Sequence, residues 1–206
     1  MILIGQYDSP FVRRVGIALR LYGLGFEQVP LSVFGDAAAV SRVNPLIRVP
    51  VLVLKDGLVL TDSHLILDYV DDMVAAPLAP RSGLERAIVL RVTGLFCGIA
   101  DKAVSLFYEK NLHEVPSASY CARCSLQITT ALTALEAERA VRRGRWWFGD
   151  TLSHADIALG CALRFLGDAH PDLLPTDSYP HLQAAAAQAE SLPVFTEISQ
   201  NFVPPA

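Results

Sequence analysis

The chain has 206 residues, of which 52% are hydrophobic and 18% are charged, and its net charge at neutral pH is −4. These proportions exclude an intrinsically disordered chain, because they supply enough apolar side chains for a substantial core. No stretch free of Asp, Glu, Lys and Arg approaches the roughly 18 residues typical of a membrane-spanning helix. The first residues lack the positive start of a secretory signal, and the four cysteines are too unevenly spaced for a disulfide framework. We therefore expect a cytoplasmic protein.

The charge is spread evenly along the chain, which argues against a nucleic-acid binder, since such proteins usually concentrate basic residues in one region. The basic cluster of the sequence consists of Arg139, Arg142, Arg143 and Arg145. It ends a long helical pattern, where cations complement the helix dipole. We therefore expect neither nucleic acid nor a membrane as a partner.

The first 76 residues change repeatedly between strand-like and helical patterns. The sequence predicts strands over 1–6, 26–31, 49–54 and 58–60, and helices around 12–22, over a weak segment at 35–42, and from about 63 to 70. Asp56-Gly57, between two apolar runs, is the strongest short hairpin signal. The order β-α-β-α-β-β-α indicates an α/β domain with a small mixed sheet.

From about residue 77 the pattern changes. A segment rich in proline and glycine, residues 77–84, predicts a linker. The remainder, 85–206, shows only helical stretches, which run roughly over 84–110, 117–143, 154–168, 179–190 and 193–201. We expect an all-α second domain.

One helix start in this second part is strongly specified. Ser153 stands three residues before Asp156, a capping box in which Asp replaces Glu or Gln. Leu152 and Ile157 occupy the positions of a hydrophobic staple. This pattern favours folding and requires no catalytic role.

The first candidate site lies between the first strand and the first helix. Ser9 is a candidate N-cap, and Pro10 occupies the first helical position, where its missing N–H costs nothing. Capping alone would explain Ser9. The functional alternative is a hydroxyl donor aimed at an anionic sulfur or oxygen beside the unpaired N–H groups of the helix.

Two further candidates precede the third strand and follow the fourth. Val49-Pro50 stands where proline is permitted at a strand start, and a cis bond there is one alternative. Asp62-Ser63 opens a helix, so that both side chains act as caps or hold the headgroup of an amino acid.

These pieces form a recognisable series. Ser-Pro-Phe-Val-Arg-Arg-Val begins at Ser9, Asn-Pro-x-x-x-Val-Pro-Val-Leu begins at Asn44, and Asp-Ser follows at 62–63. With the linker, the helical second half and Leu-Ser-His-Ala-Asp-Ile from Leu152, they resemble the cytosolic glutathione transferases over nearly the whole chain. The resemblance is greatest to bacterial serine-type members. One departure is Ile47-Arg48, where family members often have Gly-Lys.

The resemblance implies a thioredoxin-like glutathione-binding domain over 1–76, the linker at 77–84, and an all-helical domain over 85–206 that carries the electrophile site. It further implies a homodimer that uses glutathione as co-substrate, without a metal. Ser9 would hydrogen-bond the glutathione sulfur as the catalytic residue. The implied glutathione-binding residues are Phe11, Phe34, Arg48, Val49, Pro50, Asp62 and Ser63. A small, hydrophobic electrophile would bind against side chains from about Leu95 to Tyr108.

The implied activity is activation of the glutathione thiol for attack on an electrophile. A glutathione-dependent maleyl-type isomerase remains an alternative, and so does a non-catalytic protein-interaction scaffold of the same fold. Tyr7 is the next hydroxyl donor if Ser9 is not the one, and Asp101 could reach the glutathione of a partner subunit. Cys121 and Cys124 form a C-x-x-C within a helical pattern, and we interpret them as ordinary helix residues.

Overall fold

The computed structural model describes residues 1–203, so the last three residues of the predicted second domain lie outside the described part. The chain divides into two compact units. The first contains Met1–Leu78 together with the chain from Leu192 onward, and the second contains Ala79–Ser191.

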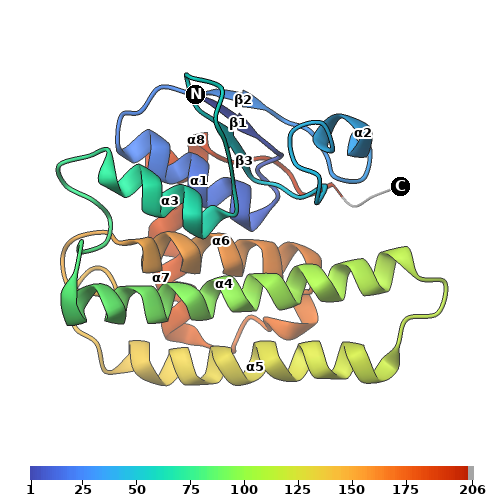
Figure 1. The fold of residues 1–206 in the computed structure, drawn as a ribbon. Helices are drawn as coiled ribbons and strands as arrows, with labels where there is room; N and C mark the ends of the chain where they lie inside the picture. The colour runs from blue at the N-terminus through green and yellow to red at the C-terminus, as the bar shows by residue number, and fades with distance from the viewer. Residues whose placement is uncertain (204–206) are drawn as a thin grey trace. The chain divides into compact units, whose positions relative to one another are not determined.

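The first unit is built on a four-stranded mixed sheet (Figure 1). Its elements are β1 (Ile2–Ile4), α1 (Pro10–Leu21), β2 (Glu27–Val29), α2 (Ala37–Val40), β3 (Val51–Val53), β4 (Val59–Thr61), α3 (Ser63–Asp72) and α8 (Pro193–Glu197). The strand order is β2-β1-β3-β4, in which β1 is parallel to β2 and antiparallel to β3, and β3 is antiparallel to β4. The predicted β-α-β-α-β-β-α order is confirmed, although the strands and α2 are shorter than the apolar runs suggested.

Helices α1 and α3 pack side by side and supply the core of this unit (Figure 1). The predicted helical face of α1 is buried, with Val12, Val15 and Leu19 fully inaccessible. Ile66 and Val70 of α3 are equally buried. A 3.6-residue period that places apolar side chains on one stripe accounts for both helices.

The second unit is all-helical, as predicted. It contains α4 (Gly83–Leu112), α5 (Ala118–Ala140), α6 (His154–Ala169), the short 3₁₀ helix η1 (Pro171–Leu173) and α7 (Pro180–Glu190). Helix α4 packs against α5 and α6, and α7 packs against the same two helices (Figure 1). The predicted capping box at Ser153 and Asp156 is present. The Asp156 carboxylate accepts the Ser153 N–H at 2.9 Å and the Trp147 N–H at 2.7 Å.

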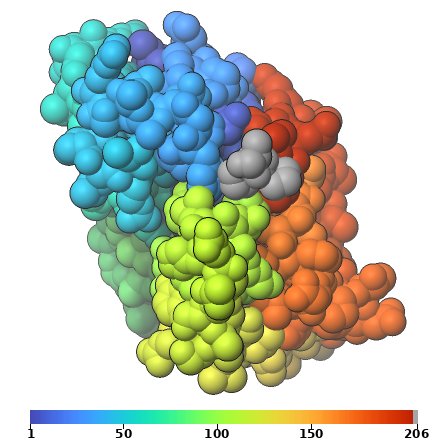
Figure 2. Space-filling view, turned by 90° about the vertical axis from the view of Figure 1, so that its right-hand side faces the viewer, coloured from blue at the N-terminus to red at the C-terminus, as the bar shows by residue number. Residues whose placement is uncertain are grey.

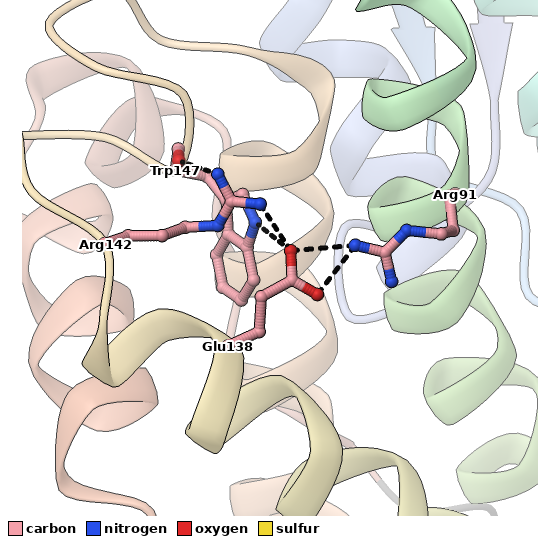
Figure 3. A network of polar contacts seen from close by, with 4 residues as sticks. All are labelled: Arg91, Glu138, Arg142 and Trp147. Carbon is pink, nitrogen blue, oxygen red and sulfur yellow. Dashed lines mark hydrogen bonds and ion pairs between the residues drawn. The ribbon is translucent and has the colours of Figure 1, made fainter. Parts of the chain in front are cut away.

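The basic cluster at the end of α5 holds the α5–α6 connection through specific contacts. Arg142 donates to the Glu138 carboxylate at 2.5 Å and to the Trp147 carbonyl at 3.3 Å, and Arg91 of α4 donates to the same carboxylate at 2.7 and 2.8 Å (Figure 3). The Arg145 guanidinium lies 5.3 Å from the centre of the Trp146 ring. The cluster is therefore structural, as interpreted. Besides lying where cations complement the helix dipole, its side chains form an ion pair and stack on aromatic rings.

The C-terminal segment departs from the expectation that 85–206 forms one helical domain, because residues from Leu192 onward belong to the first unit. Buried Arg13 of α1 donates to the carbonyls of Phe195 and Ile198, each at 2.9 Å, and its guanidinium lies 5.5 Å from the centre of the Phe195 ring. Figure 2 shows the C-terminal residues of this unit, in red, against its N-terminal residues, in blue. The helix predicted over 193–201 ends at Glu197, and residues 199–203 have no regular secondary structure.

Candidate functional site

Four chain connections meet at the same end of the strands of the first unit. Ile4, at the end of β1, pairs with Val29 at the end of β2 and with Val51 at the start of β3. Val51 in turn pairs with Thr61, the last residue of β4. Three segments therefore leave the sheet here, after β1, β2 and β4, and the segment before β3 enters the sheet beside them. All the residues predicted for the glutathione site lie on these segments or on the helix turns that they lead into.

Ser9 caps α1, as predicted. Its Oγ accepts the Val12 N–H at 3.4 Å, and Pro10 occupies the first turn. A hydroxyl has two acceptor lone pairs and one donor hydrogen. Since capping uses only an acceptor position, the Ser9 hydroxyl can cap the helix and still donate to an anion beside it. The two interpretations of Ser9 are compatible.

The Val49–Pro50 bond is cis, as the resemblance implied. The segment before it is held by buried Asn44, whose Nδ2 donates to the Arg48 carbonyl at 2.8 Å and whose Oδ1 accepts the Leu46 N–H at 3.0 Å. Asn44 therefore has a structural role that the motif alone did not assign.

Gly5 brings this segment close to α1. Its φ is +129°, and a Cβ at this position would lie 2.5 Å from Cγ2 of Val12 and 2.9 Å from Cβ of Val49. A side chain here would push one neighbour away. The absence of one therefore lets Val49 approach the first turn of the helix that Ser9 caps.

Asp62 and Ser63 form the start of α3. Asp62 accepts the His64 N–H at 2.8 Å and has a φ of +68°, a conformation that non-glycine residues rarely adopt. Such a conformation persists only where surrounding structure imposes it, and it is frequent at ligand sites. The Ser63 side chain is 2% exposed.

The motif analysis assigned no role to Arg14, which the structure places against Ser63. Arg14 is 2% exposed, and its Nη1 donates to the Ser63 Oγ at 3.1 Å. Within the part of the chain that the structure describes, its Nε has no hydrogen-bond partner. This cation raises the positive potential at the start of α3 and leaves the Ser63 O–H available to donate. No sequence motif indicated that Arg14 would be buried against Ser63.

Tyr7 is oriented differently from Ser9. A Cβ at Gly16 would lie 3.0 Å from Cε1 of Tyr7, so the ring packs beside the second turn of α1. Burial raises the pKa of the Tyr7 phenol, and the charges of Arg20 and Glu197 act on it in smaller measure. Arg20 lies about three helical turns after Ser9 on α1. The Ser9 hydroxyl, in contrast, lies at the start of the helix.

The remaining predicted residues make few side-chain contacts that define a site. Phe11 is half-buried in the first turn of α1. Phe34 belongs to the connection after β2 and is 37% exposed. Arg48 is exposed and takes part in the segment through its carbonyl. Asp101, on α4, pairs with Lys102 at 2.9 Å.

Three further features concern metal binding, cysteine chemistry and membrane insertion. Among residues 1–203, no group of three or more His, Cys, Asp and Glu side chains could hold a metal ion. Cys121 and Cys124 are free cysteines within α5, as interpreted. None of the described helices combines the length and the apolar character needed to cross a membrane.

A thioredoxin-like sheet with a polar site at the start of α1 and α3, accompanied by an all-helical unit, defines a class of two-domain glutathione-dependent enzymes. Comparison with known families agrees. Residues 3–77 match the glutathione S-transferase N-terminal domain, and residues 122–185 match the glutathione S-transferase C-terminal domain.

Individual relatives are similar over most of the chain. The uncharacterized GST-like protein YibF of Escherichia coli is 33% identical over 168 residues, which are 81% of this chain and 82% of that protein. Maleylacetoacetate isomerase of Rattus norvegicus is 27% identical over 199 residues, which are 94% of this chain and 90% of that protein. A crystal structure of a glutathione transferase family member from Pseudomonas fluorescens Pf-5, with bound glutathione, is 32% identical, covers 100% of this chain and 99% of its own, and superposes with a TM-score of 0.82.

The chain therefore belongs to the glutathione S-transferase family. It is a glutathione transferase, an enzyme that takes glutathione as its co-substrate.

Proposed function

We propose that this transferase activates the glutathione thiol through Ser9, in the manner of bacterial serine-type members. The position of the Ser9 hydroxyl at the N-terminus of α1 carries the proposal. A free thiol has a pKa of about 8.5, and only the thiolate is a good nucleophile. A hydroxyl donor and the positive end of a helix both favour the charged form.

The reaction is a nucleophilic attack. The thiol releases its proton to solvent, and the sulfur electron pair forms a bond to an electrophilic carbon. Either a leaving group departs with its bonding electrons, or the product carbanion takes a proton. Each unit by which the site lowers the thiol pKa corresponds to about 1.4 kcal/mol of preferential thiolate stabilisation.

The start of α3 holds the γ-glutamyl end of glutathione in this proposal. Asp62 accepts from the amine, while Ser63 and the N-terminal N–H groups of α3 donate to the carboxylate. Buried Arg14 beside Ser63 supports this polarity, because a cation favours a carboxylate nearby. The backbone of Val49, before Pro50, pairs with the cysteinyl part of the tripeptide.

Three side chains line the rest of the glutathione surface. These are Arg48, Phe11 and Phe34. Because Arg48 replaces the lysine frequent in the family, its contact differs in geometry, since a planar guanidinium is not interchangeable with an ammonium group.

The electrophile binds against the helical unit, from about Leu95 to Tyr108. Leu95 and Tyr108 are each 36% exposed, and they lie on α4, which also carries buried side chains such as Phe96 and Phe107. A depression of about 600 Å³ opens beside Tyr108, and its lining combines Leu112, Val115 and Tyr120 with the polar side chains of Ser105, Glu109, His113 and Ser117. The apolar part of this lining suits a small hydrophobic electrophile.

A cytoplasmic homodimer is the proposed assembly. Leu65, Tyr69 and Met73 are exposed on one face of α3, at a helical spacing. In the other unit, Leu90 of α4 and Leu126 of α5 are also exposed. Exposed apolar stripes of this kind mark interaction surfaces, and we propose that a second copy of the chain covers them. Sedimentation velocity tests this, and a monomer at micromolar concentration would contradict it.

Calorimetric titration with reduced glutathione, followed by conjugation kinetics with the general electrophile 1-chloro-2,4-dinitrobenzene, tests the site. Asp62→Ala should weaken saturable binding. Ser9→Ala should retain most of the binding and slow conjugation at neutral pH. Full activity in Ser9→Ala would refute its role. Lack of binding up to several millimolar by the wild type would favour the scaffold alternative.

An isomerase activity is the second candidate, and the similarity to a maleylacetoacetate isomerase favours it. The thiolate would then add to a cis double bond and leave after rotation, so that glutathione is released unchanged. Turnover of maleylacetoacetate or maleylpyruvate without net loss of glutathione would establish it.

A further inference from the structure

The turn that carries Ser9 is held by the opposite end of the chain. The N–H of Tyr7 donates to Oε1 of Gln200 at 2.8 Å, across a sequence separation of 193 residues. The N–H of Val203 donates to the Asp8 carboxylate, which also accepts the N–H of Ser9. The two residues immediately before Ser9 are therefore both bonded to the C-terminal segment.

The C-terminal segment is itself fixed to α1, the helix that Ser9 caps. The Arg13 guanidinium binds the carbonyls of Phe195 and Ile198. Ile198 is 2% exposed, and its Cγ2 would lie 2.9 Å from a Cβ at Gly16. The segment is thus anchored to the first two turns of α1 and reaches back past the helix start to Tyr7.

These contacts form a closed structural ring. It runs from Ser9 along the first turn of α1 to Arg13, across to Ile198, along the segment to Gln200, and back to Tyr7. Within the turn, the Ser9 N–H lies 3.2 Å from the Gln6 carbonyl, a long hydrogen bond. The ring therefore supplies restraints on the turn that its own backbone bonds do not.

We propose that Gln200 is a positioning residue for the Ser9 hydroxyl. This inference rests on the proposed role of Ser9. Gln200 acts through Tyr7 and does not touch glutathione. By fixing the turn, it fixes the direction in which the hydroxyl donates, so that the donor meets the thiolate without reorganisation. Loss of this bond lowers the ionised fraction of bound glutathione and leaves the Asp62 and Ser63 contacts in place.

Gln200→Met is the test, because it removes the acceptor and nearly keeps the side-chain volume. Titration of the ultraviolet thiolate absorbance of enzyme-bound glutathione against pH is the measurement. We expect the thiol pKa to rise by about 0.5–1 unit, which makes the thiolate fraction about three- to tenfold smaller at a pH well below that pKa. The dissociation constant of glutathione should change less than twofold. Asn201→Leu, an exposed neighbour on the same segment, is the matched control and should titrate as the wild type.

A double variant separates positioning from a general structural effect. If Gln200 acts through Ser9, Gln200→Met adds no further shift in a Ser9→Ala background. An additive shift, or a wild-type titration in Gln200→Met, would overturn the inference while leaving the role of Ser9 intact. A wild-type titration in Ser9→Ala would overturn both.

A second pair of variants tests the same ring independently of Gln200. Val203→Pro removes the N–H that Asp8 accepts, and Val203→Ala keeps it. If Gln200→Met fails to fold, the comparison of Val203→Pro with Val203→Ala decides. The proline variant should show the raised thiol pKa and the alanine variant should not, and equal titrations would overturn the inference.

Discussion

Replacement of Glu138 should destabilise the helical unit more than any exposed ion pair could. The Glu138 carboxylate receives Arg91 and Arg142, and Nε1 of Trp147 lies 3.4 Å from it (Figure 3). Burial tends to raise the pKa of Glu138, but the hydrogen bonds from Arg91, Arg142 and Trp147 and the charge of Arg91 together outweigh this and leave the pKa below its ordinary value. The carboxylate is therefore ionised at neutral pH and links α4, α5 and the α5–α6 connection.

The two ion pairs contribute unequally because they differ in exposure. The Arg91 side chain is 52% exposed, so its pair contributes at most about 1 kcal/mol. The Arg142 side chain is 27% exposed, stacks on the Trp147 and Phe148 rings, and has a buried Nε without a partner among the described residues. Loss of its carboxylate should cost about 2–3 kcal/mol. Glu138→Ala should therefore cost about 3–4 kcal/mol, Glu138→Gln about 1–2 and Arg91→Ala less than about 1.

Urea unfolding followed by tryptophan fluorescence measures this. Both tryptophans of the chain, Trp146 and Trp147, lie in the helical unit, so the signal follows that unit. With a slope of about 3 kcal/mol per molar urea, Glu138→Ala should lower the midpoint by about 1 M. The reasoning is refuted if Arg91→Ala lowers the midpoint as much as Glu138→Ala does, because exposure would then not determine the contribution.

Three further predictions concern the pH dependence of stability, the turn after β1 and the start of α6. Burial lowers the pKa of His170, so the unfolded chain takes up a proton first and stability falls as the pH drops below about 6.5. His170→Asn should flatten this fall in urea titrations, and an unchanged pH dependence in this variant would contradict the assignment. Gly5→Ala should weaken glutathione binding about tenfold or more by calorimetry, because its Cβ has no room. Gly57→Ala changes a glycine that also has a positive φ but open surroundings, and it should bind normally. Equal binding by both variants would argue against the importance of the close approach between Val49 and α1. Asp156→Asn should cost about 1–3 kcal/mol in thermal unfolding, since an amide offers one acceptor oxygen to the two backbone N–H groups that the carboxylate holds; an unchanged midpoint would show that these bonds do not contribute.

Features that depend on residues close in sequence could be predicted well. The hairpin at Asp56-Gly57 and the capping box at Ser153 are each set by a few neighbouring side chains, and both are present. Helix α6 begins at His154 as the capping pattern predicted. Local chemistry sets such signals, so tertiary packing does not need to be known.

Features that depend on distant residues could not be predicted. Nothing in the residues around Arg13 indicates that its guanidinium binds carbonyls near Ile198, and the helical pattern over 193–201 favoured a longer helix than the structure has. The pairing of Arg14 with Ser63 likewise joins two helices that are separate in the sequence. The motif placed both residues near the candidate site, but only the packing of α1 against α3 shows which side chains meet.

The return of the C-terminal segment to α1 has a consequence for biosynthesis. A chain that leaves the ribosome from its N-terminus can form the sheet and its helices early, but Arg13 remains without its carbonyl partners until residues near Ile198 emerge. The turn before Ser9 also waits for Gln200. We therefore expect the first unit to be completed only after the second has been synthesised, so a nascent chain stalled before residue 192 would expose an unfinished surface along α1.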